Sequence, residues 1–378
     1  MKKVSVNKTV NRHIALEVWT HQHSPERSSI ESDVIDRLLL KCTLNSLQLL
    51  FRHDTIIAAL TIVIIQSAIG NISKMLISIC MCTYKRATLE RTLNSIVPQK
   101  MPPGYELEIV VVDNDVEESG RTICEKVQQS QSAVPVRYFV NGVRNLSNIR
   151  NSTMEYAEGE LFLFIDDDEW ASTDTWMAQL IKTLNDYNAD IVFGRVLVHY
   201  PDSTPDWIAQ GNMLGKVIFP HGKLLKKGAT SNALMKAHWA RDKGFVFDPY
   251  FGKSGGEDTD LFHRIYKAGG KLVYDAHALV EEVAEPQRVN LAYIKKLNTR
   301  IGHTHYDYLW SKQSGLAYVG TGFFVLAQIA GYGLLTVVSF PFGKGRYMRW
   351  YVKTIRNVVK LKTAIEGGGK PVELYGNN

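Results

Sequence analysis

The stretch LFLFIDDDE at residues 161–169 decides the fold class of this chain, because an apolar strand runs directly into four acids. Carboxylates packed this closely at the end of a buried strand repel one another and resist desolvation, so they need positive charge among them. Hard carboxylate oxygens suit Mg²⁺ or Mn²⁺, which indicates a divalent metal site. A solvated acidic turn is the alternative. A second acidic cluster, SGGEDTD at 254–260, suggests a separate catalytic base.

Strand-like and helix-like segments alternate on both sides of this stretch. The pattern predicts strands at residues 76–81, 107–112, 136–140, 161–165 and 191–198, and helices at 88–96, 121–131, 148–157 and 176–187. This alternation is typical of an α/β domain. Acidic and polar residues come just after the strands, where open parallel sheets bind their ligands.

The two ends of the chain differ from this domain in composition. Residues 1–74 contain scattered polar residues and one apolar run at 55–65. That run is short for a bilayer span of about 20 residues, and it lies too far from the N-terminus for a signal peptide. A membrane anchor and a mis-assigned start upstream of Met75 are both open interpretations. We therefore expect an N-terminal extension at 1–74, an α/β domain at 75–310 and a separate C-terminal segment at 311–378.

The C-terminal segment combines an apolar stretch with a basic helix. No charged residue occurs between Lys312 and Lys344, and residues 316–340 are apolar enough to span a bilayer. Basic residues flank this stretch on both sides, so the positive-inside rule favours a bent, re-entrant or interfacial hairpin over a straight span. The helix that follows is expected to lie in the headgroup region, because it is basic on one side and apolar on the other. A buried helical pair packed on the domain is the alternative.

The net charge of +6 comes from this tail, since residues 344–378 carry a surplus of the same size. Nucleic-acid binding would require a basic surface with aromatics on the folded body, so we expect no nucleic-acid partner. A basic tail beside an apolar segment favours a membrane surface instead. The four cysteines lack C-x-x-C spacing, which indicates neither a disulfide framework nor a zinc site.

Several motifs occur in order along the domain: CTYKR at 82–86, VVVDN at 110–114, NIRN at 148–151, DDDE at 166–169 and GED at 256–258. Together they resemble the inverting family 2 glycosyltransferases of GT-A fold. Further signatures, which are LSNIRN at 146–151, GKSGGEDTD at 252–260, AGG at 268–270 and R-x-G-x-T-H at 300–305, are most similar to the ExoM-type glucosyltransferases of succinoglycan biosynthesis. The resemblance covers residues 76 to about 310. It implies a Rossmann-like mixed sheet that binds a nucleotide-diphospho-sugar.

The resemblance implies a nucleotide site at the ends of the first two strands. Asp113 would accept the ring N–H of uracil, and Thr83 and Tyr84 would line the base, Tyr84 by stacking. Arg150 would hold the nucleotide. Two alternatives stay open, because Asp113 is also placed to cap the following helix and Arg150 to be an ordinary surface arginine.

The resemblance also assigns the acid run to the metal and the donor. Asp168 would ligate the Mg²⁺ or Mn²⁺ ion, and Asp166 would contact the ribose or the metal. Asp167 lies between them, with a less defined role in donor binding. A metal here would neutralise the departing diphosphate.

The second acidic cluster is expected to carry the catalysis. Asp258 resembles the family's general base, which takes the proton of the acceptor hydroxyl, and Glu257 would support it or contact the acceptor. Gly255 and Gly256 would let the backbone approach the sugar closely. The acids are also suited to begin a helix at 259–267, where negative charge is favourable, and both roles are compatible.

Two features depart from the family pattern. Many relatives have a histidine near residues 280–282, where this chain has Glu281 in the corresponding position. Arg300, His303 and His305 are the candidates for compensating at the acceptor or the diphosphate. The Q-x-x-R-W motif of processive synthases is absent after Asp258, which favours transfer of one sugar per encounter.

These observations predict an enzyme on the cytoplasmic side of the inner (plasma) membrane. It would move one hexose, glucose from UDP-glucose by resemblance, onto a polyprenyl-diphosphate-linked saccharide in exopolysaccharide biosynthesis. A sugar-1-phosphate nucleotidyltransferase is one alternative, but it would need a glycine-rich loop after the first strand, and TYKR at 83–86 offers none. A non-catalytic, membrane-tethered partner protein of GT-A fold is the other, and the presence of Asp168 and Asp258 argues against it.

Overall fold

The computed structural model describes residues 74–131 and 133–367 of the 378-residue chain. The expectations for the N-terminal extension at 1–74 therefore lie outside the described residues, apart from Lys74. The same holds for the last residues of the chain, 368–378.

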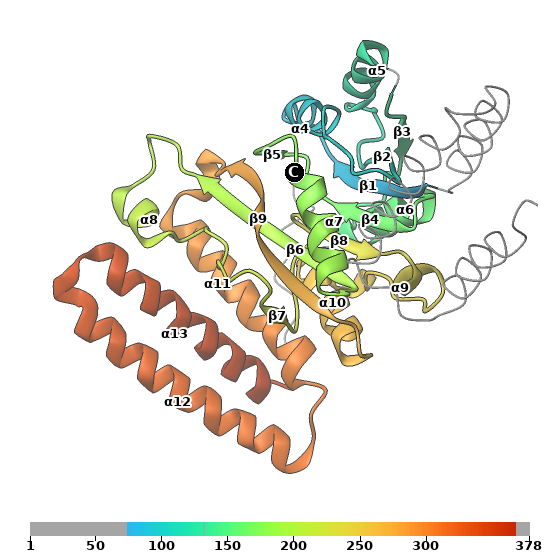
Figure 1. The fold of residues 1–378 in the computed structure, drawn as a ribbon. Helices are drawn as coiled ribbons and strands as arrows, with labels where there is room; N and C mark the ends of the chain where they lie inside the picture. The colour runs from blue at the N-terminus through green and yellow to red at the C-terminus, as the bar shows by residue number, and fades with distance from the viewer. Residues whose placement is uncertain (1–73, 132, 368–378) are drawn as a thin grey trace, which may run out of the picture. The chain divides into compact units, whose positions relative to one another are not determined.

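In the described part of the chain, nine strands form one mixed sheet (Figure 1). Their order is β3-β2-β1-β4-β8-β6-β9-β5, and β7 pairs with β9. The strands are β1 (Met75–Thr83), β2 (Tyr105–Asp113), β3 (Val136–Val140), β4 (Leu161–Phe164), β5 (Glu169–Ala171), β6 (Ile191–His199), β7 (Leu224–Leu225), β8 (Ala233–Lys236) and β9 (Leu272–Val283). β1 to β4 are parallel to one another, whereas β8 is antiparallel to β4 and β6, and β5 is antiparallel to β9. The predicted mixed α/β sheet is confirmed.

Helices cover both faces of this sheet. They are α4 (Leu89–Ile96), α5 (Arg121–Ser130), α6 (Leu146–Tyr156), α7 (Trp176–Asp186), α8 (Asp206–Gly211), α9 (His238–Arg241) and α10 (Glu257–Lys267), with short 3-10 turns η1 (Pro249–Phe251) and η2 (Pro286–Arg288). Successive strand residues point to opposite faces. Leu163 thus packs with α4, α5 and α7 on one face, and Phe162 and Phe164 pack with α6, α9 and α10 on the other.

The strand order brings the predicted motifs to one edge of the sheet. β1 lies between β2 and β4, and Thr83 at the end of β1 pairs with Asp113 at the end of β2. The acid run begins directly after β4. Because the carboxyl ends of neighbouring parallel strands meet at one edge, three motifs that are far apart in the sequence become neighbours.

Three long helices follow the α/β domain: α11 (Leu291–His305), α12 (Gly315–Ser339) and α13 (Lys344–Ile365), with the π-helical turn η3 (Tyr306–Trp310) and the 3-10 turn η4 (Phe340–Phe342) between them. In Figure 1, α13 lies between α11 and α12. α12 is one continuous helix, so the bend expected within the apolar stretch is not found. The hairpin consists instead of α12 and α13.

The apolar surface of this region belongs to α12. Among the described helices, the segment Gly315–Phe342 alone is long and apolar enough to cross a membrane, with a mean hydropathy of 1.9, and 11% of its most apolar window is buried. By contrast, Met348 and Val352 of α13 are buried against Ile208 of α8 and Ile294 of α11. Part of the apolar side of α13, which was expected to face the membrane, is thus covered by protein, whereas Val358 is 46% exposed. The alternative of a buried helical pair does not fit α12, because α12 is largely exposed.

Candidate active site

Asp113 closes β2 and is completely buried. Its Oδ1 accepts the backbone N–H of Asp115 at 2.8 Å, and its Oδ2 accepts the N–H of Gly120 and the hydroxyl of Tyr138, both at 2.7 Å. Gly120 immediately precedes α5, so Asp113 holds the start of that helix, which is the alternative that the sequence left open. Direct contact with a nucleobase would require part of this hydrogen-bond network to break.

Thr83 and Tyr84 lie at the end of β1 and have different surroundings. Thr83 is buried, and its hydroxyl donates to Asp167 Oδ2 at 2.7 Å, so it holds the acid run rather than lining a base site. Tyr84 is 40% exposed and keeps a ring surface on which a base can stack. Lys85 follows with φ +51°, a left-handed conformation that turns the loop sharply after Tyr84.

The acid run occupies the turn between β4 and β5. Burial raises the pKa of Asp167 to about 7, although the hydrogen bond from Thr83 opposes the shift. Burial also raises the pKa of Asp168, and the charge of Asp166 adds to the effect. Arg86 Nη1 lies 3.8 Å from Asp168 Oδ2 and compensates in part. The alternative of a solvated acidic turn does not fit, because Asp167 and Asp168 are largely buried and Arg86 compensates their charge only in part.

The donor set of this turn fits a divalent cation. Asp166 and Asp168 offer hard carboxylate oxygens on side chains that are 41% and 16% exposed. Within residues 74–131 and 133–367, no three or more His, Cys, Asp or Glu side chains gather into a closed metal cage. Mg²⁺ is commonly bound by one or two carboxylates and completes its shell with substrate phosphates and water. The site is therefore suited to a cation that binds together with a diphosphate.

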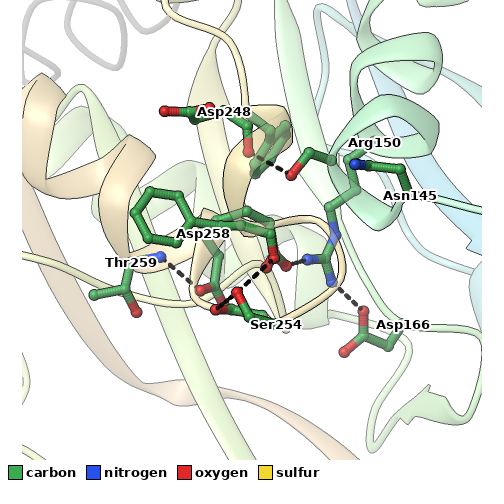
Figure 2. Close-up of polar contacts among 12 residues, drawn as sticks. Asn145, Arg150, Asp166, Asp248, Ser254, Asp258 and Thr259 are labelled. Atoms are coloured by element: carbon green, nitrogen blue, oxygen red, sulfur yellow. Dashed lines mark hydrogen bonds and ion pairs between the residues drawn. The ribbon is translucent and has the colours of Figure 1, made fainter. Parts of the chain in front are cut away.

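Arg150 on α6 connects the acid run with the second acidic cluster. Its Nη2 lies 3.3 Å from Asp166 Oδ1, and its Nη1 forms an ion pair with Glu257 Oε1. Figure 2 shows the guanidinium pointing toward Asp166, with the loop that carries Asp258 on its other side. The side chain is only 11% exposed, so the alternative of an ordinary surface arginine is wrong. The two acidic clusters therefore form one site.

Glu257 and Asp258 begin α10 but differ in exposure. Glu257 is buried, its Oε1 is held by Arg150, and burial raises its pKa against the effect of Arg150. Asp258 is partly exposed, and its Oδ1 accepts the N–H of Thr259 at 2.5 Å. Asp258 is thus the better placed of the two to reach a substrate hydroxyl. The assignment of base and supporting acid stays a prediction, and the helix-start role is compatible with it.

The glycine pair before these acids allows a close approach of α11. Gly255 and Gly256 have φ values of +76° and +100°, which favour glycine. A Cβ on Gly256 would lie 2.3 Å from Thr304 Cγ2 of α11, and the Thr304 hydroxyl donates to the Gly255 carbonyl at 3.4 Å. The space beside Gly256 is therefore filled by the protein itself, not left for a sugar as predicted.

Arg300 and His303 on α11 have separate environments. Arg300 Nη1 donates to the carbonyl of Ser254 at 3.4 Å and so lies at the second acidic cluster. The Nδ1 of His303 and the Thr363 hydroxyl of α13 lie 2.8 Å apart. This contact joins α11 to α13, and a role of His303 at the acceptor or the diphosphate stays a prediction.

His305 lies beside a lysine that the motifs did not indicate. Its Nε2 is 3.4 Å from Lys227 Nζ. Burial, followed by the charge of Lys227, lowers the pKa of His305 to about 2. The imidazole is therefore neutral near pH 7 and supplies no positive charge to a diphosphate.

Glu282, rather than Glu281, faces the acid run. β9 pairs Glu282 with Glu169 of β5, and the next residue along a strand points to the opposite face. Glu281 accordingly contacts His199. Burial and the nearby aspartates raise the pKa of Glu282, and Lys216 Nζ lies 3.8 Å from its carboxylate. A lysine and an acid thus stand where relatives were expected to have a histidine.

The sequence analysis missed Arg86 and Lys216 as parts of the site. Arg86 forms an ion pair with Glu285, in the loop after β9, and lies beside the acid run. It belongs to the quoted motif CTYKR, so its position could have indicated a role. Lys216 lies in the loop at 212–223, where no motif or periodicity marks it. Although burial opposes the shift, the charge of Glu282, followed by other acids of the site, raises the pKa of Lys216.

Comparisons with known proteins identify the family of this chain. The family model described as Glycosyl transferase family 2 matches residues 78–245. The succinoglycan biosynthesis protein ExoM of Rhizobium meliloti (strain 1021) is 31% identical over 301 residues, which are 79% of this chain and 96% of that protein. The mannosyltransferase PcManGT from Pyrobaculum calidifontis, solved with GDP-Man and Mn²⁺, has a TM-score of 0.53 at 14% identity, covering 77% of this chain and 87% of its own. TarS 1-349 of S. aureus, solved with UDP-GlcNAc, has a TM-score of 0.45 at 14% identity, with coverages of 78% and 93%.

Proposed function

Because the chain belongs to glycosyl transferase family 2, we propose that this glycosyltransferase moves one hexose from a UDP-sugar to a lipid-linked saccharide. The resemblance stated from the sequence is confirmed at the level of family and enzyme class. The observation that carries the proposal is the bridge of Arg150 between Asp166 and Glu257, which joins the acid run to Asp258. A donor bound at one acidic cluster would therefore meet a base at the other.

The residues of the site divide the reaction between them. Asp168 and Asp166 would hold a divalent cation, which when bound supplies Lewis-acid neutralisation of the diphosphate. Asp258 would take the proton of the acceptor hydroxyl while that oxygen forms a bond to the anomeric carbon, on the face opposite the diphosphate. The bond from this carbon to the diphosphate oxygen breaks, and UDP leaves with the electron pair. The proton on Asp258 passes to water, and the anomeric configuration is inverted.

The relatives support the proposed donor and pathway. UDP is proposed as the nucleotide and glucose as the hexose on the resemblance to the ExoM-type enzymes. Exopolysaccharide biosynthesis is proposed because the relative that is 31% identical over most of the chain is a succinoglycan biosynthesis protein. The exposed ring of Tyr84, next to the acid run, supports stacking of the base at the end of β1.

The helices α12 and α13 support attachment to a membrane surface rather than a span. The two helices contact each other along their length, through Tyr318 and Ala364 at one end, Tyr332 and Trp350 in the middle, and Phe340 and Tyr347 at the other. If α12 crossed the bilayer, the basic α13 would have to cross with it, at a cost of about 2.5 kcal/mol or more for each central charge. An interfacial position avoids this cost.

The exposed residues of α12 are suited to that position. Leu316, Phe323, Phe324 and Val337 are 91%, 69%, 63% and 71% exposed, so this helix presents a large apolar surface. Basic residues of α13 lie next to it and would face anionic lipid headgroups. Such headgroups are enriched in the cytoplasmic leaflet, which supports the proposed cytoplasmic side of the plasma membrane.

A donor screen tests the proposed function. Purified full-length protein is mixed with lipid-linked saccharides extracted from membranes, a divalent cation and one nucleotide-sugar at a time, and release of UDP is measured. We expect release with UDP-glucose, dependent on the lipid extract and lost in Asp258→Asn. Release of diphosphate from UTP and a sugar 1-phosphate would instead indicate a nucleotidyltransferase. Absence of both reactions with every donor would contradict the proposal.

A further inference from the structure

Three basic side chains, Lys227, Arg356 and Lys360, gather near Asp258. Lys227 lies in the loop after β7, and its ammonium donates to the hydroxyl of Tyr308 at 2.6 Å. Arg356 and Lys360 lie one turn apart on α13. Burial, followed by the charges of Arg356 and Lys360, lowers the pKa of Lys227 to about 8, which indicates that the three cations are within range of one another.

Close packing of two helices brings the cations of α13 to this place. A Cβ on Gly302 of α11 would lie 2.7 Å from the carbonyl oxygen of Arg356, so glycine permits the contact. Arg356 Nη2 donates to Asn298 Oδ1 of α11 at 2.7 Å. The same helix carries His305, whose ring contacts Tyr308 and Lys227. α11 therefore links α13 to the loop of Lys227.

Positive charge at this cluster is not balanced by acids. Asp258 is the carboxylate that acts on Lys227, whereas Arg356 and Lys360 have pKa values that are lowered, first by burial. Among the described residues, Arg356 Nε is a buried donor with no hydrogen-bond partner. Buried charges and buried donors are costly unless they are paired. Three cations around one acid therefore form an environment that favours an anion.

The position of the three cations indicates which kind of molecule would carry such an anion. Two of its cations belong to α13, which packs along the exposed apolar helix α12. The third lies beside Asp258, the predicted base. An anion bound here would thus lie close both to α13, which packs against α12, and to the predicted base Asp258.

We propose that Lys227, Arg356 and Lys360 bind a phosphoryl group carried by a lipid, namely the diphosphate of the lipid-linked acceptor. The inference rests on the proposed function and adds to it the location of the acceptor's anionic group. Arginine and lysine are the side chains that recognise phosphate in proteins, arginine through its planar set of donors. The acidic donor side needs an added cation to bind a diphosphate, whereas this cluster supplies its own positive charge.

Binding to vesicles tests the proposal without any sugar transfer. Full-length protein is sedimented with phosphatidylcholine vesicles that contain polyprenyl diphosphate, phosphatidylglycerol of equal charge, or neither, in the presence of a chelator. We expect binding to polyprenyl diphosphate vesicles to be at least about tenfold tighter than to the phosphatidylglycerol vesicles. Equal binding to both anionic vesicles would overturn the proposal, because it would indicate unspecific attraction to surface charge.

Two double variants with the same change in charge locate the site. Lys227→Gln with Lys360→Gln should lose the preference for polyprenyl diphosphate. The control, Lys296→Gln with Lys362→Gln, removes two exposed lysines of α11 and α13 outside the cluster and should keep it. Equal loss in both pairs would overturn the proposal. So would a parallel loss of UDP affinity in the first pair, because the cluster would then belong to the donor.

A third variant guards against misfolding. Lys227→Gln alone changes an exposed residue, so the fold should be retained, and an unchanged melting temperature verifies this. It should weaken polyprenyl diphosphate binding by about tenfold, as expected for loss of one charged hydrogen bond. Wild-type affinity in this variant and in the double variant would refute the site. Since no donor is present, either result leaves the sugar-transfer test independent.

Discussion

The two sides of the active site carry opposite charge and are assembled in different ways. On the donor side, Asp166, Asp167 and Asp168 follow one strand and are held by groups at the end of a neighbouring strand. On the proposed acceptor side, Lys227 and Arg356 come from a loop and from α13, and both contact side chains of α11. This difference implies that the two diphosphates of the proposed reaction would be bound in different ways. The donor diphosphate would need an added cation, whereas the diphosphate of the lipid-linked acceptor would not.

Asp258 lies between these two sides, and its replacement should have the largest effect on turnover. Asp258→Asn keeps the shape of the side chain but removes its ability to accept a proton. We expect the transfer rate to fall by about 10²–10⁴-fold, the usual contribution of a general base. UDP affinity, measured by calorimetry, should stay within a factor of about two of wild type, since the donor side is untouched. Unchanged turnover would remove Asp258 from the mechanism.

Arg150 forms ion pairs with both acidic clusters, and its loss should mainly lower the free energy of unfolding. Arg150→Met leaves Glu257 buried without its cation, which costs about 3–5 kcal/mol in unfolding free energy. Denaturant unfolding measures this change. The double variant Arg150→Met with Glu257→Gln should recover part of it, because the buried charge is then absent. If the double variant were no more stable than Arg150→Met alone, loss of the ion pair would not explain the lower free energy of unfolding.

The predicted need for a cation distinguishes the donor side from the acceptor side. Asp168→Ala should weaken UDP binding in the presence of Mg²⁺ or Mn²⁺ by at least about 10-fold. Even the loss of a residue that only hydrogen-bonds a metal ligand weakens metal binding or activity by about this factor. A chelator should have the same effect on the wild type, but it should leave polyprenyl diphosphate binding unchanged. Tight UDP binding that survives the chelator would contradict the assignment of the acid run.

The contact between Gly256 and Thr304 fixes the loop of Asp258 against α11, and so joins the acceptor side to the base. Gly256→Ala imposes a side chain at φ +100° and a clash with Thr304 Cγ2, which should cost about 1–3 kcal/mol. Thr304→Ser removes the clashing methyl group, so the double variant should be more stable than Gly256→Ala alone. If Gly256→Ala and the double variant are equally unstable, backbone strain at residue 256 accounts for the whole loss of unfolding free energy.

The sequence predicted which motifs meet at the carboxyl edge of the sheet, because backbone topology determines this. An acid that follows a parallel strand comes to the ligand-binding edge whatever the details of packing, so the place of Asp113 and of the acid run could be predicted. Their hydrogen bonds could not. Asp113 turned out to hold the start of α5, and Thr83 to hold Asp167, because side-chain partners depend on loop conformation.

The acceptor side could not be predicted in the same way. Lys227 lies in a loop without a motif, and its neighbours are set by how α11 and the turn after it pack. The motif R-x-G-x-T-H contains Arg300, which lies at the second acidic cluster, but it does not show that His303 contacts α13 or that burial lowers the pKa of His305. Burial of a histidine is a property of the folded protein and leaves no mark in a motif.

The smallest expected effect is the pH dependence of the acceptor side. Lys227 has a pKa of about 8, below the ordinary value of 10.5, because of burial and the charges of Arg356 and Lys360, which outweigh Asp258. Above pH 8 its ammonium loses the proton that attracts a phosphate. Affinity for polyprenyl diphosphate vesicles should therefore fall as pH rises through 8, by at most about tenfold per pH unit.

The same linkage gives the sign of two further observables. A bound diphosphate stabilises the charged form of Lys227, so binding near pH 8–9 should take up a proton, which calorimetry in buffers of different ionisation enthalpy measures. UDP binding on the donor side should lack this proton uptake. In Lys227→Gln the affinity should become flat across this range. If the affinity for polyprenyl diphosphate still fell with pH in this variant, the titrating group would be one other than Lys227. The proposed difference between the donor side and the acceptor side would then lose its support.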